Sequence, residues 1–195
     1  MNGPSRGVST EELVRKIKTC TLCRLHRSRK NAVPGEGPLD TKVMFCGEAP
    51  GFNEDLQAKP FVGSAGKFLN ELLQIAGLRR EGVYITNVVK CRPPQNRDPA
   101  DDEIETCTTN YLQKQVAVIK PKLVVALGRI AARALLGRYV MIGKEHGKLL
   151  DCTYAGASFR LFLTYHPAAA LYGAETKSKL QADFRKLKSI LKSLR

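Results

Sequence analysis

The chain has 195 residues, of which 43% are hydrophobic, so it is long enough to bury one sizeable core. Its 32 lysine and arginine residues exceed its 18 aspartate and glutamate residues, which gives a net charge of +14. This charge favours a polyanionic partner, with nucleic acid as the first candidate and a merely solvated lysine surface as the alternative. The sequence contains no membrane-spanning stretch and no secretory signal in residues 1–9, so we expect an intracellular, cytoplasmic protein with no membrane partner.

The first half of the chain predicts two helices and two strands. Residues 9–12 (STEE) resemble a capping box that starts a short helix running into a pair of cysteines. The apolar run 42–51 predicts a buried parallel strand that ends in a loop rich in glycine and proline. Residues 64–76 have helical periodicity closed by a glycine, and residues 83–87 (VYITN) predict a second strand.

The second half predicts a third strand, a hairpin and three helices. The hairpin should turn near Ala155–Gly156, and its second strand should end at His166. The predicted elements, in chain order, are a long helix over 98–120, a strand over 122–128, a helix over 130–137, the hairpin over 148–167 and an amphipathic helix over 176–195.

Buried strands that alternate with helices predict an α/β fold, a three-layer α/β/α sandwich with a central, mainly parallel four-stranded sheet. We expect residues 1–195 to form a single domain, with the cysteine-rich subregion as an integral part of it. Ligands of such folds bind beyond the carboxyl ends of the strands. Glu48, Asn87 and His166 follow three of the predicted strands, so we expect them to lie near one another.

Four cysteines, Cys20, Cys23, Cys91 and Cys107, follow the pattern C-x2-C, 67 intervening residues, and C-x15-C. Two thiolates three residues apart can both reach one metal centre, and a second, distant pair can complete a four-sulfur shell, so the pattern indicates a metal or iron–sulfur site. Zinc is the main competitor, although its second pair is usually as closely spaced as its first. A pair of disulfides or four unrelated buried thiols would also be compatible with these positions.

Two further cysteines, Cys46 and Cys152, fall outside this pattern. We interpret both as small hydrophobic core residues, with a bond between them as the alternative.

Four motifs carry a resemblance to a known family: GEAPGFNED (47–55), KPFVGSAG (59–66), VYITNVVKCRPPQNRDP (83–99) and YHPAAALY (165–172). Together with the four cysteines they resemble family 4 uracil-DNA glycosylases, over nearly the whole chain from Cys20 onward. The resemblance implies an α/β/α sandwich with a structural [4Fe–4S] cluster. It also implies excision of uracil from single- or double-stranded DNA, which leaves an abasic site and starts base-excision repair.

Three residues match the family's central positions: Phe61 for stacking on uracil, Asn87 for reading it and His166 for catalysis. The chemistry requires such groups, because cleavage of the glycosidic bond leaves a uracil anion and an electron-poor sugar. An asparagine offers an acceptor for uracil N3–H and a donor for O4, whereas cytosine presents the reverse pattern. A histidine can donate to the charge that develops on O2.

Other positions are less determined by the resemblance. In the best-known branch of the superfamily an aspartate occupies the position of Ala49, so no residue here inherits the general-base role. Glu48 is the candidate for positioning water, or it only braces its loop. The resemblance assigns Glu54 to the pocket wall near uracil C5, where its side chain would exclude the methyl group of thymine. The backbone amides from Glu48 to Gly51 are candidates for holding the base or water. Leu171 is the candidate wedge that fills the DNA stack, with ordinary packing as the alternative.

Two other functions compete with a monofunctional glycosylase. One is a catalytically silent iron–sulfur or zinc protein of the same fold that only binds nucleic acid. The other is the branch that becomes trapped covalently on its product, but the histidine-bearing insertion of that branch is missing before Lys59. We expect a monomer, for which a sliding clamp is a candidate partner.

Overall fold

The computed structural model describes residues 9–193. Its centre is one sheet of five strands in the spatial order β2-β1-β3-β5-β4. The strands are β1 (Val43–Gly47), β2 (Tyr84–Asn87), β3 (Leu123–Leu127), β4 (Leu149–Tyr154) and β5 (Ala157–Thr164). β1, β2, β3 and β5 run parallel, whereas β4 pairs antiparallel with β5. The predicted mainly parallel sheet is confirmed, but the prediction of four strands is wrong because both hairpin strands join the sheet.

The α-helices of the described chain surround this sheet. They are α1 (Thr10–Lys18), α2 (Phe52–Gln57), α3 (Ser64–Ile75), α4 (Asp101–Cys107), α5 (Gln113–Ile119), α6 (Arg129–Leu136), α7 (Ile142–Glu145) and α8 (Ala174–Ser193). Short 3₁₀ turns cover Arg24–Arg27, Arg80–Gly82, Pro94–Asn96 and Pro167–Leu171. The helix predicted over 98–120 begins at Asp101, and a π-helical turn at Thr108–Leu112 joins its two α-helical parts.

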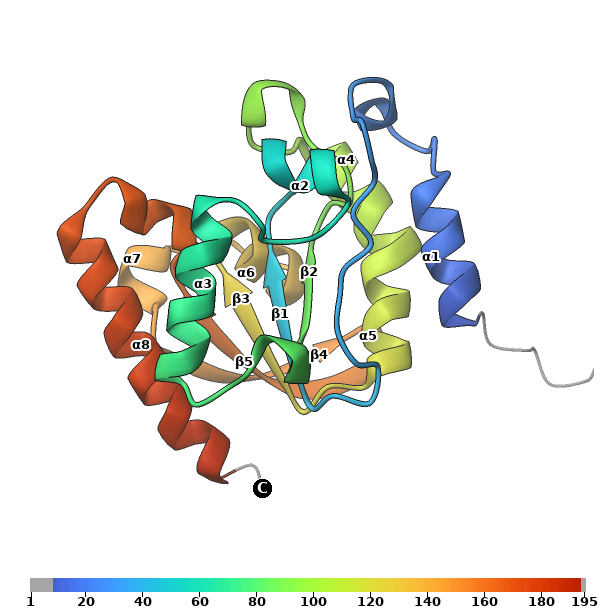
Figure 1. The fold of residues 1–195 in the computed structure, drawn as a ribbon. Helices are drawn as coiled ribbons and strands as arrows, with labels where there is room; N and C mark the ends of the chain where they lie inside the picture. Colours follow the sequence, from blue (N-terminus) through green and yellow to red (C-terminus); the bar gives the residue numbers. More distant parts are fainter. Residues whose placement is uncertain (1–8, 194–195) are drawn as a thin grey trace, which may run out of the picture.

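The helices cover both faces of the sheet, which gives the predicted three layers (Figure 1). Side chains of a strand alternate between the faces, so Phe45 packs with the side of α3 and α8, whereas Met44 and Cys46 pack with the side of α1, α5 and α6. Both cores are built from buried aliphatic and aromatic side chains. Because these strands contribute side chains to both cores, β1 and β3 read as continuous apolar runs.

Local signals set several element boundaries. Ser9 caps α1 by accepting a hydrogen bond from the Glu12 amide at 3.2 Å, as its sequence predicts. β5 ends at Thr164, two residues before the predicted end at His166, and α8 begins two residues earlier than predicted. The predicted end of that helix at residue 195 lies outside the described residues.

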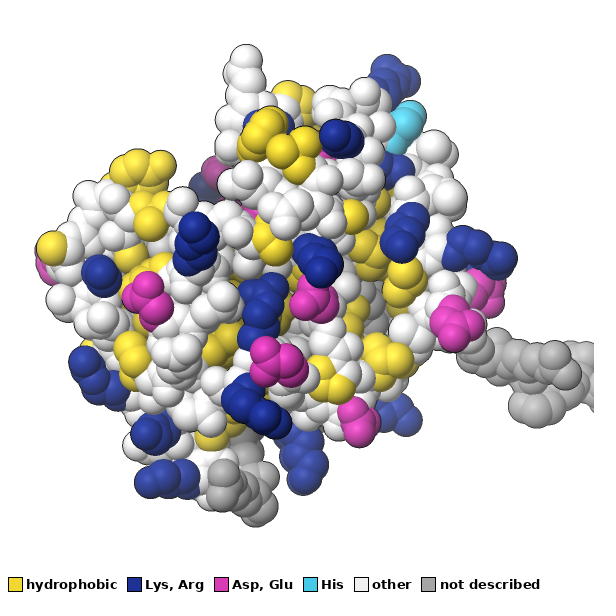
Figure 2. Space-filling view, in the orientation of Figure 1, with side chains coloured by type: hydrophobic (Ala, Val, Ile, Leu, Met, Phe, Trp, Pro, Cys, Tyr) yellow, Lys and Arg dark blue, Asp and Glu magenta, His cyan; other side chains and the backbone are white. Residues whose placement is uncertain are grey.

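The face shown in Figure 2 carries many lysine and arginine side chains, with acidic side chains scattered between them. They lie over α3 and α8 and along the lower edge, near the start of the parallel strands. None of the helices within residues 9–193 combines the length and the apolar character that crossing a lipid bilayer requires.

Candidate functional site

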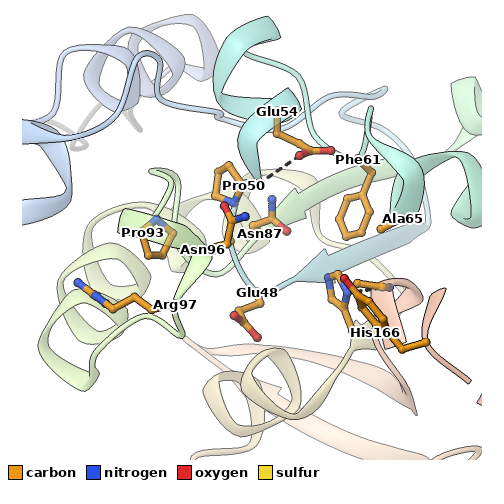
Figure 3. A pocket seen from close by; sticks show the side chains of 14 residues that line it. Glu48, Pro50, Glu54, Phe61, Ala65, Asn87, Pro93, Asn96, Arg97 and His166 are labelled. Atoms are coloured by element: carbon orange, nitrogen blue, oxygen red, sulfur yellow. Dashed lines mark hydrogen bonds between the residues drawn. The ribbon is translucent and has the colours of Figure 1, made fainter. Parts of the chain in front are cut away.

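A cavity of about 470 Å³ lies at the carboxyl ends of β1, β2 and β5, where the fold predicts a ligand site. Figure 3 shows Glu48, Phe61, Asn87 and His166 around this hollow, each from a different segment. The prediction that Glu48, Asn87 and His166 lie near one another is therefore confirmed. The lining residues are Glu48, Ala49, Pro50, Gly51, Glu54, Phe61, Ala65, Asn87, Pro93, Asn96, Arg97, His166, Ala168 and Tyr172.

Asn87 is the last residue of β2, and its side chain is buried with 1% exposure. Neither its Nδ2 nor its Oδ1 has a hydrogen-bond partner among residues 9–193. Buried amides are normally paired, so this one donor and one acceptor are available to a ligand. Gly47 lies beside it at the end of β1, where a Cβ would stand 2.4 Å from Asn87 Oδ1 and 2.6 Å from Phe61 Cζ. No pattern in the sequence marks this need for glycine, which only the fold reveals.

Phe61 is a non-glycine residue with a positive φ of 51°, and its ring is buried. The ring stacks on the His166 imidazole with 5.6 Å between centroids and 28° between planes. Arg80 holds this segment by donating to the carbonyls of Pro60 at 2.6 Å and Phe61 at 3.2 Å. Gly66, in the first turns of α3, allows the close approach, since a Cβ there would lie 1.9 Å from the Phe61 carbonyl oxygen.

His166 caps the 3₁₀ turn that follows β5, because its Nδ1 accepts a hydrogen bond from the Ala168 amide at 3.1 Å. An accepting Nδ1 has no proton, so the neutral ring carries its proton on Nε2. Burial lowers the pKa of His166 to about 4, and the charge of Glu54 acts in the opposite direction. The ring is therefore a neutral hydrogen-bond donor near pH 7.

Glu54 lines the cavity near the start of α2, as predicted, but its carboxylate is committed to the backbone. Its Oε1 accepts from the amides of Val62 and Gly63, both at 2.8 Å, and its Oε2 accepts from the amide of Gly51 at 3.2 Å. Figure 3 shows Glu54 beside Pro50 at one end of the hollow. The carboxylate thus joins the loop after β1 to the loop that carries Phe61, and the Gly51 amide is already donated within the protein.

Glu48 follows β1 and faces the hollow from the side opposite Glu54 (Figure 3). Burial raises the pKa of Glu48 to about 7; the charge of Asp98 adds to the rise and that of Arg129 opposes it. A carboxyl group that titrates near neutral pH inside a cavity is suited to proton transfer or to orienting water.

The remaining expected residues, Ala49 and Leu171, differ in their position relative to the cavity. Ala49 lines the cavity as predicted, whereas Leu171 is about half exposed on the following 3₁₀ turn and is not among the lining residues. Asn96, Arg97 and Tyr172 do line it, and no single-residue signal distinguishes them from turn residues in the sequence.

The four patterned cysteines come from α4 and from three loop positions around it. Their sulfurs accept hydrogen bonds from the Leu22 amide to Cys20 (3.5 Å), Arg29 Nη1 to Cys91 (2.8 Å) and the Lys90 amide to Cys107 (3.3 Å). Burial raises the pKa of Cys107 to about 12; Lys90 opposes this rise, and the charges of Cys91 and Cys23 add to it. The sulfurs thus lie within electrostatic reach of one another.

All six cysteines are free thiols, which excludes disulfides, including one between Cys46 and Cys152. Both of those two are buried core residues, as interpreted. Within residues 9–193, no group of three or more histidine, cysteine or acidic side chains is arranged to hold a single metal ion.

Comparisons with known proteins agree with the motifs. A family model described as "Uracil DNA glycosylase superfamily" matches residues 34–192. A type-4 uracil-DNA glycosylase of Saccharolobus solfataricus is 49% identical over 91% of this chain and 84% of its own. Those of Archaeoglobus fulgidus and Thermotoga maritima are 44% and 43% identical, over 92% and 91% of this chain and 92% of each relative.

Proposed function

Because the chain belongs to the uracil-DNA glycosylase superfamily, and within it to the type-4 enzymes, we propose that it flips uracil out of DNA and hydrolyses its glycosidic bond. The product is an abasic site, which starts base-excision repair. We propose a monofunctional enzyme that acts without cutting the strand, on single- or double-stranded DNA. The net charge of +14 supports a polyanionic substrate.

The observation that carries this proposal is the unpartnered amide of Asn87 in a buried cavity. Its Oδ1 fits uracil N3–H and its Nδ2 fits uracil O4, so a flipped uracil satisfies both groups at once. Cytosine would meet both groups with the wrong polarity and would leave them unsatisfied. The Phe61 ring beside Gly47 offers the flat apolar surface on which the base stacks.

His166 and Glu48 supply the proposed chemistry. The neutral His166 ring keeps a proton on Nε2, which is suited to donate to uracil O2 as negative charge develops there. Glu48, ionised above a pKa of about 7, would position the water that attacks the sugar. We propose that Glu54 positions the two loops and forms the wall near uracil C5, while the amide of Ala49 holds base or water and Leu171 acts as the wedge. The amide of Gly51 donates a hydrogen bond to the Glu54 carboxylate, so Gly51 contributes to the site by helping to position Glu54.

We propose that the four patterned cysteines hold a [4Fe–4S] cluster, with zinc as the less favoured alternative. The donor set fits, because it contains four sulfurs and each of three of them accepts a hydrogen bond from an amide or a guanidinium. When bound, the cluster would supply structural cross-linking between the N-terminal segment and α4. All chemical steps of the proposed reaction are assigned to residues of the cavity.

The test measures base excision and strand cleavage on a U:G duplex, on matched T:G and C:G duplexes and on a single-stranded uracil oligonucleotide. We expect alkali-labile sites only in the uracil substrates, with the strand intact before alkali treatment. Absence of product on every uracil substrate, with DNA binding retained, would favour a catalytically silent nucleic-acid-binding protein. A monomeric state, a sliding-clamp partner and an intracellular location on DNA belong to the same proposal, and sizing with and without a clamp tests the first two.

A further inference from the structure

Lys90 is a buried lysine between the cavity and the patterned cysteines, and no step described above uses its side chain. It has 1% exposure. Its Nζ donates to the Asn87 carbonyl oxygen at 2.5 Å and to Thr86 Oγ1 at 2.8 Å. Both acceptors belong to the last two residues of β2. The ammonium group therefore binds the end of the strand that presents the Asn87 amide to the cavity.

The main chain of Lys90 contacts the cysteine region. Its N–H donates to Cys107 Sγ at 3.3 Å, its carbonyl oxygen accepts from the Val33 amide at 2.7 Å, and the next residue is Cys91. One residue thus contacts a proposed cluster ligand through its backbone and the proposed base-reading residue through its side chain.

The charge of this ammonium requires a partner, because an isolated buried cation is strongly unfavourable. No ion pair within residues 9–193 includes Lys90. Burial accordingly lowers the pKa of Lys90 to about 8, and the sulfurs of Cys107, Cys46 and Cys91 oppose this shift. The ammonium is therefore held by its two hydrogen bonds to the end of β2.

We propose that Lys90 is a positioning residue for base reading: its ammonium fixes the Asn87 end of β2 through its bonds to the Asn87 carbonyl and the Thr86 hydroxyl. This inference rests on the proposed function, since it assigns Lys90 to the same uracil site. It gives the cysteine region a specific link to the cavity beyond general cross-linking of the fold.

The experiment compares Lys90→Met with Lys114→Met, which removes the charge of an exposed lysine on α5. For Lys90→Met we expect excision of uracil under single-turnover conditions to slow about tenfold or more, because a hydrogen bond from a charged donor is lost. KM should change by less than about twofold, since DNA contacts are intact. Lys114→Met should match the parent protein.

A double variant separates positioning through Asn87 from general damage to the fold. Asn87→Asp already lacks correct base reading, so adding Lys90→Met to it should slow excision by less than about threefold. If the two effects instead multiply in full, Lys90 does not act through Asn87 and the inference is overturned. If Lys90→Met does not fold, the same cycle with Lys90→Gln decides.

An inactive parent protein would refute the proposed function, whereas an active parent with a fully active Lys90→Met variant would refute only this inference.

Discussion

At the scale of single residues, the polar side chains of the cavity differ in whether the protein already provides their hydrogen-bond partners. Glu54 accepts three backbone hydrogen bonds and His166 accepts one at Nδ1, so both are fixed before any ligand binds. Asn87 has no such partner within the described residues, and Glu48 has a raised pKa. The first pair therefore shapes the site, and the second pair is available for recognition and chemistry.

Replacing Asn87 with aspartate tests base reading most directly. Asn87→Asp keeps the shape of the side chain but replaces the amide donor with an acceptor, which would face uracil O4 repulsively. The expected cost is about 2–4 kcal/mol, which corresponds to a loss of uracil excision of roughly 10² or more. Slow cytosine excision should accompany it, most visibly in mismatched duplexes, as measured by parallel assays on U:G and C:G substrates. A parental rate on uracil would show that Asn87 is not the reader.

The pH dependence of the chemical step tests Glu48. If its carboxylate positions water, only the ionised form is active, so the single-turnover rate should rise with pH and level off above about pH 7. Glu48→Gln should lower the rate and remove this rising limb. His166, with a pKa near 4, stays neutral throughout this window and contributes no limb of its own. A Glu48→Gln profile that keeps the same limb would assign the titration to another group.

At the scale of elements, the cavity depends on close contacts between segments that precede and follow helices. The start of α3 approaches the Phe61 backbone, and the end of β1 approaches Asn87. Both approaches require glycine, because any Cβ would overlap with neighbouring atoms. These contacts place Phe61 and Asn87 beside the same cavity.

Gly66→Ala tests this dependence. In an ordinary helix, alanine in place of glycine stabilises by about 1 kcal/mol, but here the Cβ would collide with the Phe61 carbonyl. We therefore expect Phe61 to shift and uracil excision to fall about tenfold or more, while the circular dichroism spectrum stays near that of the parent. Gly82→Ala is the matched control, since no atom lies within 4 Å of its added Cβ. Equal activity of both variants would argue against a packing role for Gly66.

How far the sequence predicts these elements depends on whether the signal is local. The strand runs 43–47 and 123–127 are apolar throughout, and the cap at Ser9 is a local pattern, so both are predictable. The π-helical turn after Cys107 is not, since no residue within it marks the extra residue per turn. The need for glycine at Gly47 is equally invisible, because it arises only when β2 lies beside β1.

At the scale of the whole molecule, the patterned cysteines connect segments far apart in the chain. Cys20 lies just after α1, and Cys107 is the last residue of α4. A cluster bound to both cysteines would therefore close a loop that contains the residues between them. α1 also packs on the body through the buried side chains of Leu13 and Ile17. The motif spacing predicts this connection, but not that Arg29 and Lys90 donate hydrogen bonds to the sulfurs of Cys91 and Cys107.

The proposed cluster predicts a brown protein with broad absorption on the order of 400 nm after anaerobic purification. Cys107→Ser should lose much of this colour and unfold at a lower temperature, because one ligand is removed. Cys152→Ser, a change at a buried cysteine outside the pattern, should keep the colour. A colourless parent protein that contains one zinc per chain would contradict the cluster.

The unpartnered amide of Asn87 also has a thermodynamic consequence. A buried donor and acceptor without protein partners lower the stability of the ligand-free fold, and each such group costs about 1–3 kcal/mol. Asn87→Ala removes both groups at a position that already borders a cavity, so it should raise the melting temperature while abolishing base reading. Free uracil should instead raise the melting temperature of the parent alone. Selection for heat resistance by itself would therefore eliminate the very residue on which recognition depends.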